Sequence, residues 1–249
     1  MQKLELNNNK FHGTIPSSIY DLNDLYYFDV SYNALTGSIM ENDPKSKSSL
    51  EYLYASHNKL QGTLSNSIRK LKKLQYLWIH ENNIKGNIPA SLFDLKYLQS
   101  LILYGNAFTG TIPRPIKTAQ RLNYADFSNN KLSGRFNRGA FESKSLQYLY
   151  LNHNQFTGSV PDVTKAAGNY SMLHHLWLNG NKFTGGIPSR IGRLNNLGAL
   201  LLQDNYFNGT MPKEVCDLRG GNMVNLEADC GNTTGSNYTV DCPCCTLCV

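Results

Sequence analysis

An asparagine recurs along this chain at a nearly constant interval. Seven of the eight spacings are 24 or 25 residues and one is 27, for the series Asn9, Asn33, Asn58, Asn82, Asn106, Asn130, Asn154, Asn181 and Asn205. Each copy follows a group of apolar residues, as Asn82 follows Leu74, Leu77 and Ile79. A fixed period of this length predicts a solenoid, in which each repeat packs only against its two neighbours.

Each repeat is predicted to contain one strand and one short helical segment. Residues 74–79 alternate between apolar and polar, which predicts a strand with one buried face. Equivalent strands come from successive repeats, so they form a parallel sheet with a spacing of about 4.8 Å. The side chain of Asn82 is expected to turn inward and satisfy backbone groups of the bend. We therefore expect an α/β solenoid, mostly β, with a concave parallel sheet of about ten strands and no helix longer than about three turns.

The repeat pattern extends beyond the asparagine. It reads L-x-x-L-x-L-x-x-N-x-L, followed by G-x-I-P at Gly13–Pro16, Gly110–Pro113 and Gly185–Pro188. From Met1 to about Asp217 the chain resembles plant-type leucine-rich repeat proteins, which include receptor-kinase ectodomains and secreted inhibitors. The resemblance implies a right-handed horseshoe or superhelix that binds a protein or a peptide.

The repeats and the C-terminal tail form two regions. Residues 1–217 hold nine full repeats, and residues 218–249 hold a degenerate strand at Met223–Cys230 and a cysteine-rich cap. Two repeats carry polar insertions, at residues 40–49 and 162–171, which are expected in loops on the convex side. The tail, with ADC followed by CxCCxxC, is similar to the ending of leucine-rich repeat proteins of diatoms and related algae.

All six cysteines lie after the last full repeat, at Cys216, Cys230, Cys242, Cys244, Cys245 and Cys248. Disulfides and a zinc site are the alternatives, and the paired C-x-x-C spacing of a zinc site is missing. Four glycosylation sequons agree with an oxidising compartment: Asn169, Asn208, Asn232 and Asn237. We expect three disulfides of open connectivity that seal the last repeat, in an extracellular protein that is secreted or held at the cell surface.

The beginning of the chain lacks two features of a secreted solenoid. Met1 already occupies the first leucine position of a repeat, so no signal peptide or polar N-terminal cap precedes the repeats. We expect a fragment that has lost both. No apolar run approaches the roughly 18 residues of a membrane helix, so membrane attachment would need an anchor outside this sequence. The isolated chain is expected to be monomeric.

Charge is distributed unevenly over the repeats. The formal net charge is +6, yet the five motif positions that face solvent from the concave sheet hold six acidic residues and one base, Lys3. The other 23 lysines and arginines are expected on the convex side and in loops. Charge runs of this kind usually form a solvated outer face, so we expect no nucleic-acid partner.

The sequence contains none of the common catalytic motifs, such as GxSxG, HExxH or a P-loop. Five of the six histidines fall at concave positions, at His57, His80, His153, His174 and His175. His57 and His80, in adjacent repeats, are placed to approach each other, but no third ligand is evident, whereas a metal site needs three or four converging ligands. We expect a protein that is not an enzyme and that uses no metal or cofactor.

Aromatic residues gather at motif positions three and five. Strand alternation turns both positions away from the core, so core packing does not explain them. Exposed aromatic patches usually mark interaction sites, although rings also stack along a sheet as a stabilising ladder. The candidate ligand-binding residues are Tyr52, Tyr54, Tyr76, Trp78, Ile102, Tyr124, Asp126, Tyr148, Tyr150 and Trp177.

Position five forms a stripe from Tyr54 to Trp177. Five strand steps of about 4.8 Å make it roughly 24 Å long, enough for an extended peptide of about seven residues. Asp126 interrupts the stripe and is expected to pair with a lysine or arginine of the ligand. No concave arginine is present to grip a peptide's C-terminal carboxylate, so a cationic or aromatic peptide suits this surface better.

We therefore interpret the chain as an extracellular module, of receptor-ectodomain or secreted-inhibitor type, that recognises a protein or peptide. The alternative is adsorption to ice or to a cell-wall polysaccharide through the residue after each G-x-I-P glycine. That row reads Thr14, Ser38, Thr63, Asn87, Thr111, Arg135, Ser159, Gly186 and Thr210. Asn87, Arg135 and Gly186 interrupt this polar ladder, so recognition is the favoured interpretation.

Overall fold

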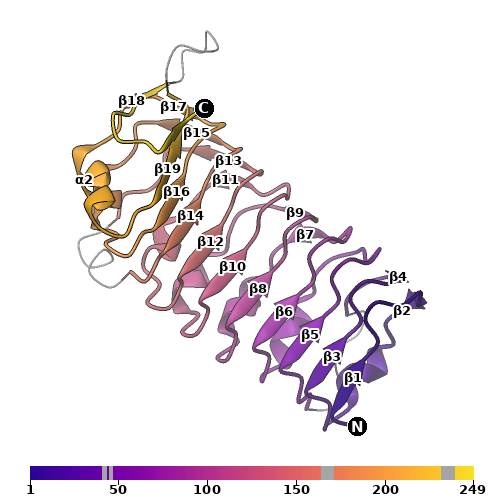
Figure 1. Ribbon diagram of the computed structural model, residues 1–249. Coiled ribbons are helices and arrows are strands. Elements are labelled where there is room, and N and C mark those ends of the chain that lie inside the picture. Colours follow the sequence, from indigo (N-terminus) through magenta and orange to yellow (C-terminus); the bar gives the residue numbers. More distant parts are fainter. Residues whose placement is uncertain (41–43, 45–46, 164–170, 231–238) are drawn as a thin grey trace.

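The computed structural model describes residues 1–40, 44, 47–163, 171–230 and 239–249. It is an elongated stack of repeats, and one parallel sheet runs along it (Figure 1). The strands in spatial order are β1 (Lys3–Glu5), β3 (Tyr27–Asp29), β5 (Tyr52–Tyr54), β6 (Tyr76–Trp78), β8 (Ser100–Ile102), β10 (Tyr124–Asp126), β12 (Tyr148–Tyr150), β14 (His175–Trp177), β16 (Ala199–Leu201), β19 (Asn225–Ala228) and β21 (Leu247–Cys248). Spatial order follows sequence order because each repeat adds its strand beside that of the preceding repeat.

This sheet has eleven strands, one more than expected. The additional strand, β21, comes from the cysteine-rich tail and pairs in parallel with β19, with Glu227 opposite Leu247 and Ala228 opposite Cys248. The predicted solenoid with a parallel concave sheet is confirmed, and the tail extends the sheet as well as closing it. The division of the chain at residue 217 stays an interpretation.

A second set of short strands follows the concave strands. These are β2 (His12–Thr14), β4 (Ala34–Thr36), β7 (Lys85–Asn87), β9 (Ala107–Thr109), β11 (Ser133–Arg135), β13 (Gln155–Gly158), β15 (Lys182–Gly185), β17 (Tyr206–Phe207), β18 (Gly209–Thr210) and β20 (Val240–Asp241). They pair in parallel with one another in groups of two or four. In β7, Gly86 has a φ of 80°, and a Cβ there would lie 2.9 Å from the Thr63 methyl carbon, so this position requires glycine.

Short helices complete the repeats on the convex side. They are η1 (Ser17–Asp21), η2 (Asn66–Lys70), η3 (Ala90–Asp94), η4 (Arg114–Thr118), η5 (Arg138–Ala140), η6 (Ser189–Arg193), α2 (Lys213–Cys216) and η7 (Asp217–Gly220). Pro89 stands directly before η3 with extended backbone angles, so its fixed φ ends the extended segment where the helix begins. The described helices are all shorter than two turns of α-helix, in agreement with the prediction.

Asn82 illustrates the role of the recurring asparagine. Its Nδ2 donates to the carbonyl oxygens of Ala55, Ile79 and His80 at 3.0, 3.1 and 3.1 Å. Its Oδ1 accepts a hydrogen bond from the backbone N–H of Leu60 at 2.9 Å. Because Ala55 and Leu60 belong to the preceding repeat, the amide closes its own bend and also joins two repeats. The expected structural role is confirmed.

One hydrophobic core runs through the repeats. Phenylalanine rings stack within it from repeat to repeat, with centroids 6.1 Å apart for Phe156 and Phe183 and 6.0 Å apart for Phe183 and Phe207. Each repeat covers the apolar face of its neighbour, so the core is continuous and no repeat forms a separate unit.

Three disulfides close the C-terminal tail. They join Cys216 to Cys244, Cys230 to Cys248, and Cys242 to Cys245. All six cysteines of the chain are paired, so the predicted disulfides are confirmed and the zinc alternative is wrong. The Cys230–Cys248 bond holds β21 beside β19, which accounts for the eleventh strand.

Parts of both insertions, residues 41–43, 45–46 and 164–170, lie outside the described residues. The same holds for three of the four predicted glycosylation sites, Asn169, Asn232 and Asn237. Asn208 is described and exposed, between β17 and β18, so it is accessible as a glycosylation site requires.

Candidate functional site

The aromatic residues at motif positions three and five lie side by side on the concave sheet. The strands pair in register, so Tyr52 lies opposite Tyr76 and Tyr54 lies opposite Trp78. The same register is kept in the later repeats, where Tyr150 lies opposite Trp177. Residues of one motif position therefore form a row that crosses the sheet from repeat to repeat.

The first group of rings, the N-terminal aromatic cluster, consists of Tyr27, Tyr52, Tyr54, Tyr76 and Trp78. The rings of Tyr52 and Tyr76 stack with their centroids 4.9 Å apart. Tyr54 and Trp78 stack at 4.4 Å, and Tyr27 packs edge-on against Tyr54 at 5.5 Å. All five side chains are partly exposed, so the cluster forms a surface and not a core.

The second group, the C-terminal aromatic cluster, consists of Tyr124, Tyr148, Tyr150, His175 and Trp177. The centroids of Tyr150 and Trp177 are 4.4 Å apart, and those of Tyr148 and His175 are 5.0 Å apart. The Tyr150 hydroxyl forms a hydrogen bond with Nδ1 of His175 at 3.1 Å. His175 shares motif position three with these tyrosines but was not among the predicted ligand-binding residues.

Strand β8 separates the two clusters. It carries Ser100 and Ile102 at the two motif positions where its neighbours carry rings. The Ser100 hydroxyl is buried and accepts a hydrogen bond from Nε1 of Trp78 at 2.9 Å, whereas Ile102 is partly exposed. The single stripe predicted from the sequence is therefore divided into two aromatic clusters with an aliphatic side chain between them.

Stacking along the sheet determines which part of each ring is offered to a ligand. Neighbouring rings cover one another's faces, as Tyr54 and Trp78 do, so ring edges and hydroxyls remain. Burial raises the pKa of the Tyr54 and Tyr150 hydroxyls, so both stay protonated at neutral pH. The Tyr54 hydroxyl can donate to a ligand, whereas the Tyr150 hydroxyl is already hydrogen-bonded to His175. A cation–π contact needs an uncovered ring face, whereas electropositive ring edges and hydroxyl donors suit carbonyl oxygens. The surface therefore favours a ligand rich in hydrogen-bond acceptors.

Four rings form a further row, of which the sequence analysis predicted only the approach of His57 to His80. Tyr32, His57, His80 and Tyr104 contact one another in series, with centroids 4.2, 5.2 and 4.5 Å apart. Burial lowers the pKa of His80 to about 4, so this ring is neutral at pH 7. Tyr32 and His57 occupy motif position eight, whereas His80 and Tyr104 occupy motif position seven, so neither position is aromatic throughout. Reading the two positions together would have found it.

Repeats seven to nine hold unpartnered polar atoms near the C-terminal aromatic cluster. Oδ1 of Asn152, Oδ1 of Asn179, Oε1 of Gln203 and Nε1 of Trp177 are shielded from solvent and have no hydrogen-bond partner within the described part of the chain. The three amides share motif position seven. A buried polar atom without a partner costs about 1–3 kcal/mol and is uncommon in native proteins. Their concentration marks these repeats as a candidate region for polar recognition.

Asp126 does not lie as the sequence analysis expected. Its side chain is only 9% exposed, and Oδ1 accepts hydrogen bonds from the Ser128 backbone N–H and hydroxyl at 2.9 and 2.7 Å. Asp29 makes the corresponding bond to the backbone N–H of Ser31, so a serine two residues after the aspartate captures the carboxylate. Asp126 therefore stabilises the bend after β10, and the expected pairing with a ligand cation has no support in its geometry.

Replacing Asp126 by asparagine is expected to raise the melting temperature slightly at pH 7. Burial raises the pKa of Asp126 above its ordinary value of 3.8, so folding penalises the ionised form. This penalty is fully present above the folded-state pKa and is lost as the pH falls through it toward the unfolded value. Thermal unfolding of Asp126→Asn and the parent protein should therefore differ at pH 7 and converge near about pH 3. A lower melting temperature of the variant at pH 7 would contradict this account.

Models of known protein families match the repeats of this chain. A model for two copies of the leucine-rich repeat matches residues 48–97, and a model for the single repeat matches residues 1–22, 97–119, 145–165 and 172–194. Together these matches cover more than half of the chain. The chain belongs to the leucine-rich repeat family. A comparison of this leucine-rich repeat protein with curated protein sequences finds no match.

Solved structures similar to this leucine-rich repeat protein include plant receptors. The plant peptide hormone receptor RGFR1, in complex with RGF2, has a TM-score of 0.83 and 30% identity, over 97% of this chain and 36% of that chain. PEPR1, in complex with AtPEP1, has a TM-score of 0.75 and 32% identity, over 92% of this chain and 35% of that chain. The present chain thus spans about a third of the length of these receptor chains.

A plant ice-binding protein is also similar to the leucine-rich repeat chain. It has a TM-score of 0.68 and 25% identity, over 85% of this chain and 67% of that chain.

Two further findings concern the described residues alone. They contain no group of three or more His, Cys, Asp or Glu side chains arranged to hold a metal ion. They also contain no helix with the length and apolar character needed to span a membrane.

Proposed function

We propose that this leucine-rich repeat protein is an extracellular recognition module that binds a peptide, or an extended segment of a protein, on its concave face. The observation that carries the proposal is the pair of aromatic clusters. Strands β3, β5, β6, β10, β12 and β14 hold their residues in register, and most of the rings stay partly exposed. Strand alternation directs these rings away from the core. Surfaces of this composition supply the largest contributions to binding energy in protein interfaces.

Three further observations support the proposal. The similar receptors RGFR1 and PEPR1 were each solved with a bound partner, RGF2 or AtPEP1, and RGFR1 is described as a peptide hormone receptor. The three disulfides and the exposed sequon at Asn208 suit a secreted or cell-surface glycoprotein. The repeat fold itself is typical of binding modules, so a role in signalling or inhibition without catalysis follows from the proposal.

The geometry also favours one way of binding. An extended peptide offers carbonyl oxygens to the tyrosine hydroxyls and an apolar side chain to Ile102 between the clusters. Its N–H groups would face amide oxygens such as those of Asn152 and Asn179, if these side chains turn toward the ligand. The two clusters lie on either side of β8, so a peptide that contacts both crosses β8, and the two tryptophans then contribute to the same binding event.

A random peptide library selected against the immobilised protein tests the proposal. We expect Trp78→Ala and Trp177→Ala each to weaken the binding of selected peptides by about 2 kcal/mol, roughly thirtyfold, which is the scale of an interface hot spot. Isothermal titration with synthetic copies of the selected peptides measures this loss.

Tyr97→Ala provides the control, because Tyr97 is an aromatic residue 43% exposed outside the concave strands. It should leave peptide affinity unchanged. If the two tryptophan variants lose stability but bind the selected peptides as tightly as the parent protein, the rings are a packing ladder and the proposal fails.

Adsorption to ice is the second candidate function, favoured by the similar plant ice-binding protein. Thr14, Thr63 and Thr111 of the polar row after the glycines are exposed, as an adsorbing surface requires. Arg135 is exposed in the same row and interrupts it. An ice-recrystallisation assay separates the two functions, because inhibition that survives both tryptophan substitutions would assign the activity to this row.

A further inference from the structure

The convex side carries a concentration of positive charge that the concave site does not use. Segments 65–73, 89–97, 113–121 and 137–145 contain ten basic and two acidic residues, a net charge of +8, whereas the whole chain carries +6. The remainder of the chain is therefore slightly acidic. We name these four segments the basic convex face. Its basic residues are Arg69, Lys70, Lys72, Lys73, Lys96, Arg114, Lys117, Arg121, Arg138 and Lys144.

The basic convex face follows the long axis of the solenoid. Helices η2, η3, η4 and η5 come from four successive repeats, and each packs against the next. Three hollows of about 360, 360 and 400 Å³ lie along this series, and each has lysine or arginine side chains in its lining. Lys72 lines the first, Lys96 together with Asp94 the second, and Arg114 with Arg138 the third. The charges therefore border a series of hollows and not a smooth surface.

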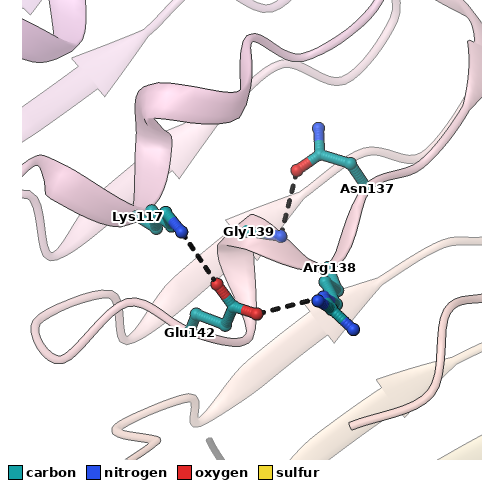
Figure 2. A network of polar contacts seen from close by, with 5 residues as sticks. All are labelled: Lys117, Asn137, Arg138, Gly139 and Glu142. Atoms are coloured by element: carbon teal, nitrogen blue, oxygen red, sulfur yellow. Dashed lines mark hydrogen bonds and ion pairs between the residues drawn. The ribbon is translucent and has the colours of Figure 1, made fainter. Parts of the chain in front are cut away.

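The third hollow shows how its side chains are held (Figure 2). The carboxylate of Glu142 lies 3.3 Å from Nζ of Lys117 and 3.1 Å from Nε of Arg138. Asn137 fixes the start of η5, because its Oδ1 accepts a hydrogen bond from the backbone N–H of Gly139 at 3.0 Å. The Glu142 carboxylate thus forms ion pairs with two cations. The pair with Arg138 involves only Nε, so the two terminal guanidinium nitrogens can bind another anion.

An aromatic ring supports another cation of the same face. The guanidinium of Arg121 lies over the ring of Tyr97, with its central carbon 5.0 Å from the ring centroid. Both side chains are exposed. The contact holds the guanidinium at the surface without neutralising it, because the ring carries no charge.

The charge distribution identifies the chemistry of the partner. Neighbouring cations with few carboxylates repel one another, and a polyanion relieves this repulsion at several repeats at once. The cations form a band along the solenoid axis, so an extended chain with an acidic group on each unit meets new cations at each repeat. Disulfides place the protein in an oxidising compartment, where acidic polysaccharides and not nucleic acids are the expected linear polyanions.

We propose that the basic convex face binds an acidic polysaccharide, whose carboxylates or sulfates pair with the lysines and arginines of η2 to η5 and their adjoining loops. This site lies outside the concave strands, so its occupant differs from the peptide ligand proposed above.

The test uses immobilised polygalacturonate as the carboxylated probe, dextran sulfate as the sulfated probe and neutral dextran as the control. We expect the full chain with its disulfides intact to bind at least one charged probe at about 0.15 M salt and not to bind neutral dextran. The affinity for the charged probe should fall at least tenfold when the salt concentration is raised to about 0.5 M. The preferred probe distinguishes carboxylate from sulfate recognition.

Two charge-reversal variants of equal net charge separate a specific site from overall charge. Lys72→Glu/Lys96→Glu acts on two hollows of the basic convex face, whereas Lys131→Glu/Lys182→Glu changes two exposed lysines outside it. Compared with the parent protein, the first variant should bind the preferred charged probe at least tenfold more weakly, and the second less than threefold more weakly. The circular dichroism spectrum should be unchanged in both variants. Equal losses in the two variants would overturn the proposal. So would the absence of binding to both charged probes, or tighter binding to duplex DNA or anionic vesicles than to either polysaccharide.

Discussion

Replacing Asn154 by alanine is expected to lower the free energy of unfolding by about 3 kcal/mol or more. Its Nδ2 donates to the carbonyl oxygens of Phe127, Leu151 and Asn152 at 2.9, 3.1 and 3.3 Å, and its Oδ1 accepts from the backbone N–H of Leu132 at 2.9 Å. Alanine would remove all four hydrogen bonds, leave the Leu132 N–H without a partner and loosen the contact between two repeats. The three carbonyl oxygens would each keep one other donor, from Asn130, Asn181 and the Asn129 backbone. Denaturant unfolding followed by circular dichroism measures the loss.

The chain offers a matched control two residues away. Asn152 and Asn154 are both 8% exposed, yet Oδ1 of Asn152 has no hydrogen-bond partner among the described residues. Asn152→Ala should therefore not lower the free energy of unfolding, because no side-chain bond to the fold is lost and a buried oxygen without a partner is removed. Similar losses in the two variants would show that burial, and not the hydrogen bonds, accounts for the effect.

The second large effect is expected at the C-terminal cap. Cys216 and Cys244 are 28 residues apart, whereas Cys242 and Cys245 are 3 residues apart. In the chain-entropy account, a disulfide stabilises a fold more when it closes a longer loop. Replacing both Cys216 and Cys244 by alanine should therefore cost about 3.5 kcal/mol, and replacing both Cys242 and Cys245 about 2 kcal/mol.

Non-reducing denaturant unfolding of the two double variants compares these losses. Mass spectrometry after alkylation first has to show that the four remaining cysteines are still paired as in the parent protein. If loss of the Cys242–Cys245 bond costs as much as loss of the Cys216–Cys244 bond, loop length does not govern the stability of this cap.

Much of the fold could be predicted because one requirement recurs in each repeat. Asn82 and its equivalents satisfy the same backbone groups in each bend, so their spacing alone indicates the solenoid. The alternation in residues 74–79 predicts which side chains are buried and which lie on the concave face, including Tyr76 and Trp78. The cysteines could be assigned to disulfides from their number and place, since no zinc-site spacing competes.

Three features could not be predicted from the repeat pattern. Each depends on contacts between different repeats, or between the tail and a repeat, and the motif gives no information on such contacts. The sequence did not predict that Ser128 would capture the carboxylate of Asp126, because the burial of that carboxylate depends on neighbouring strands. The row through His57 and His80 passes once from motif position eight to motif position seven, so no single motif position records it. The eleventh strand and the disulfide pairing follow from how the tail folds back on β19, for which the repeat pattern provides no template.

The asparagine amides have a consequence for how the solenoid comes apart. Each amide forms hydrogen bonds only within its own repeat and with the preceding one. The stability of the solenoid therefore depends on contacts between adjacent repeats, which can separate one pair at a time. At one edge of the sheet, the Cys230–Cys248 bond fastens β21 to β19 covalently. At the other edge, β1 pairs with β3 alone and no disulfide lies near it. The C-terminal aromatic cluster therefore lies nearer to a covalently closed edge of the sheet than the N-terminal aromatic cluster does.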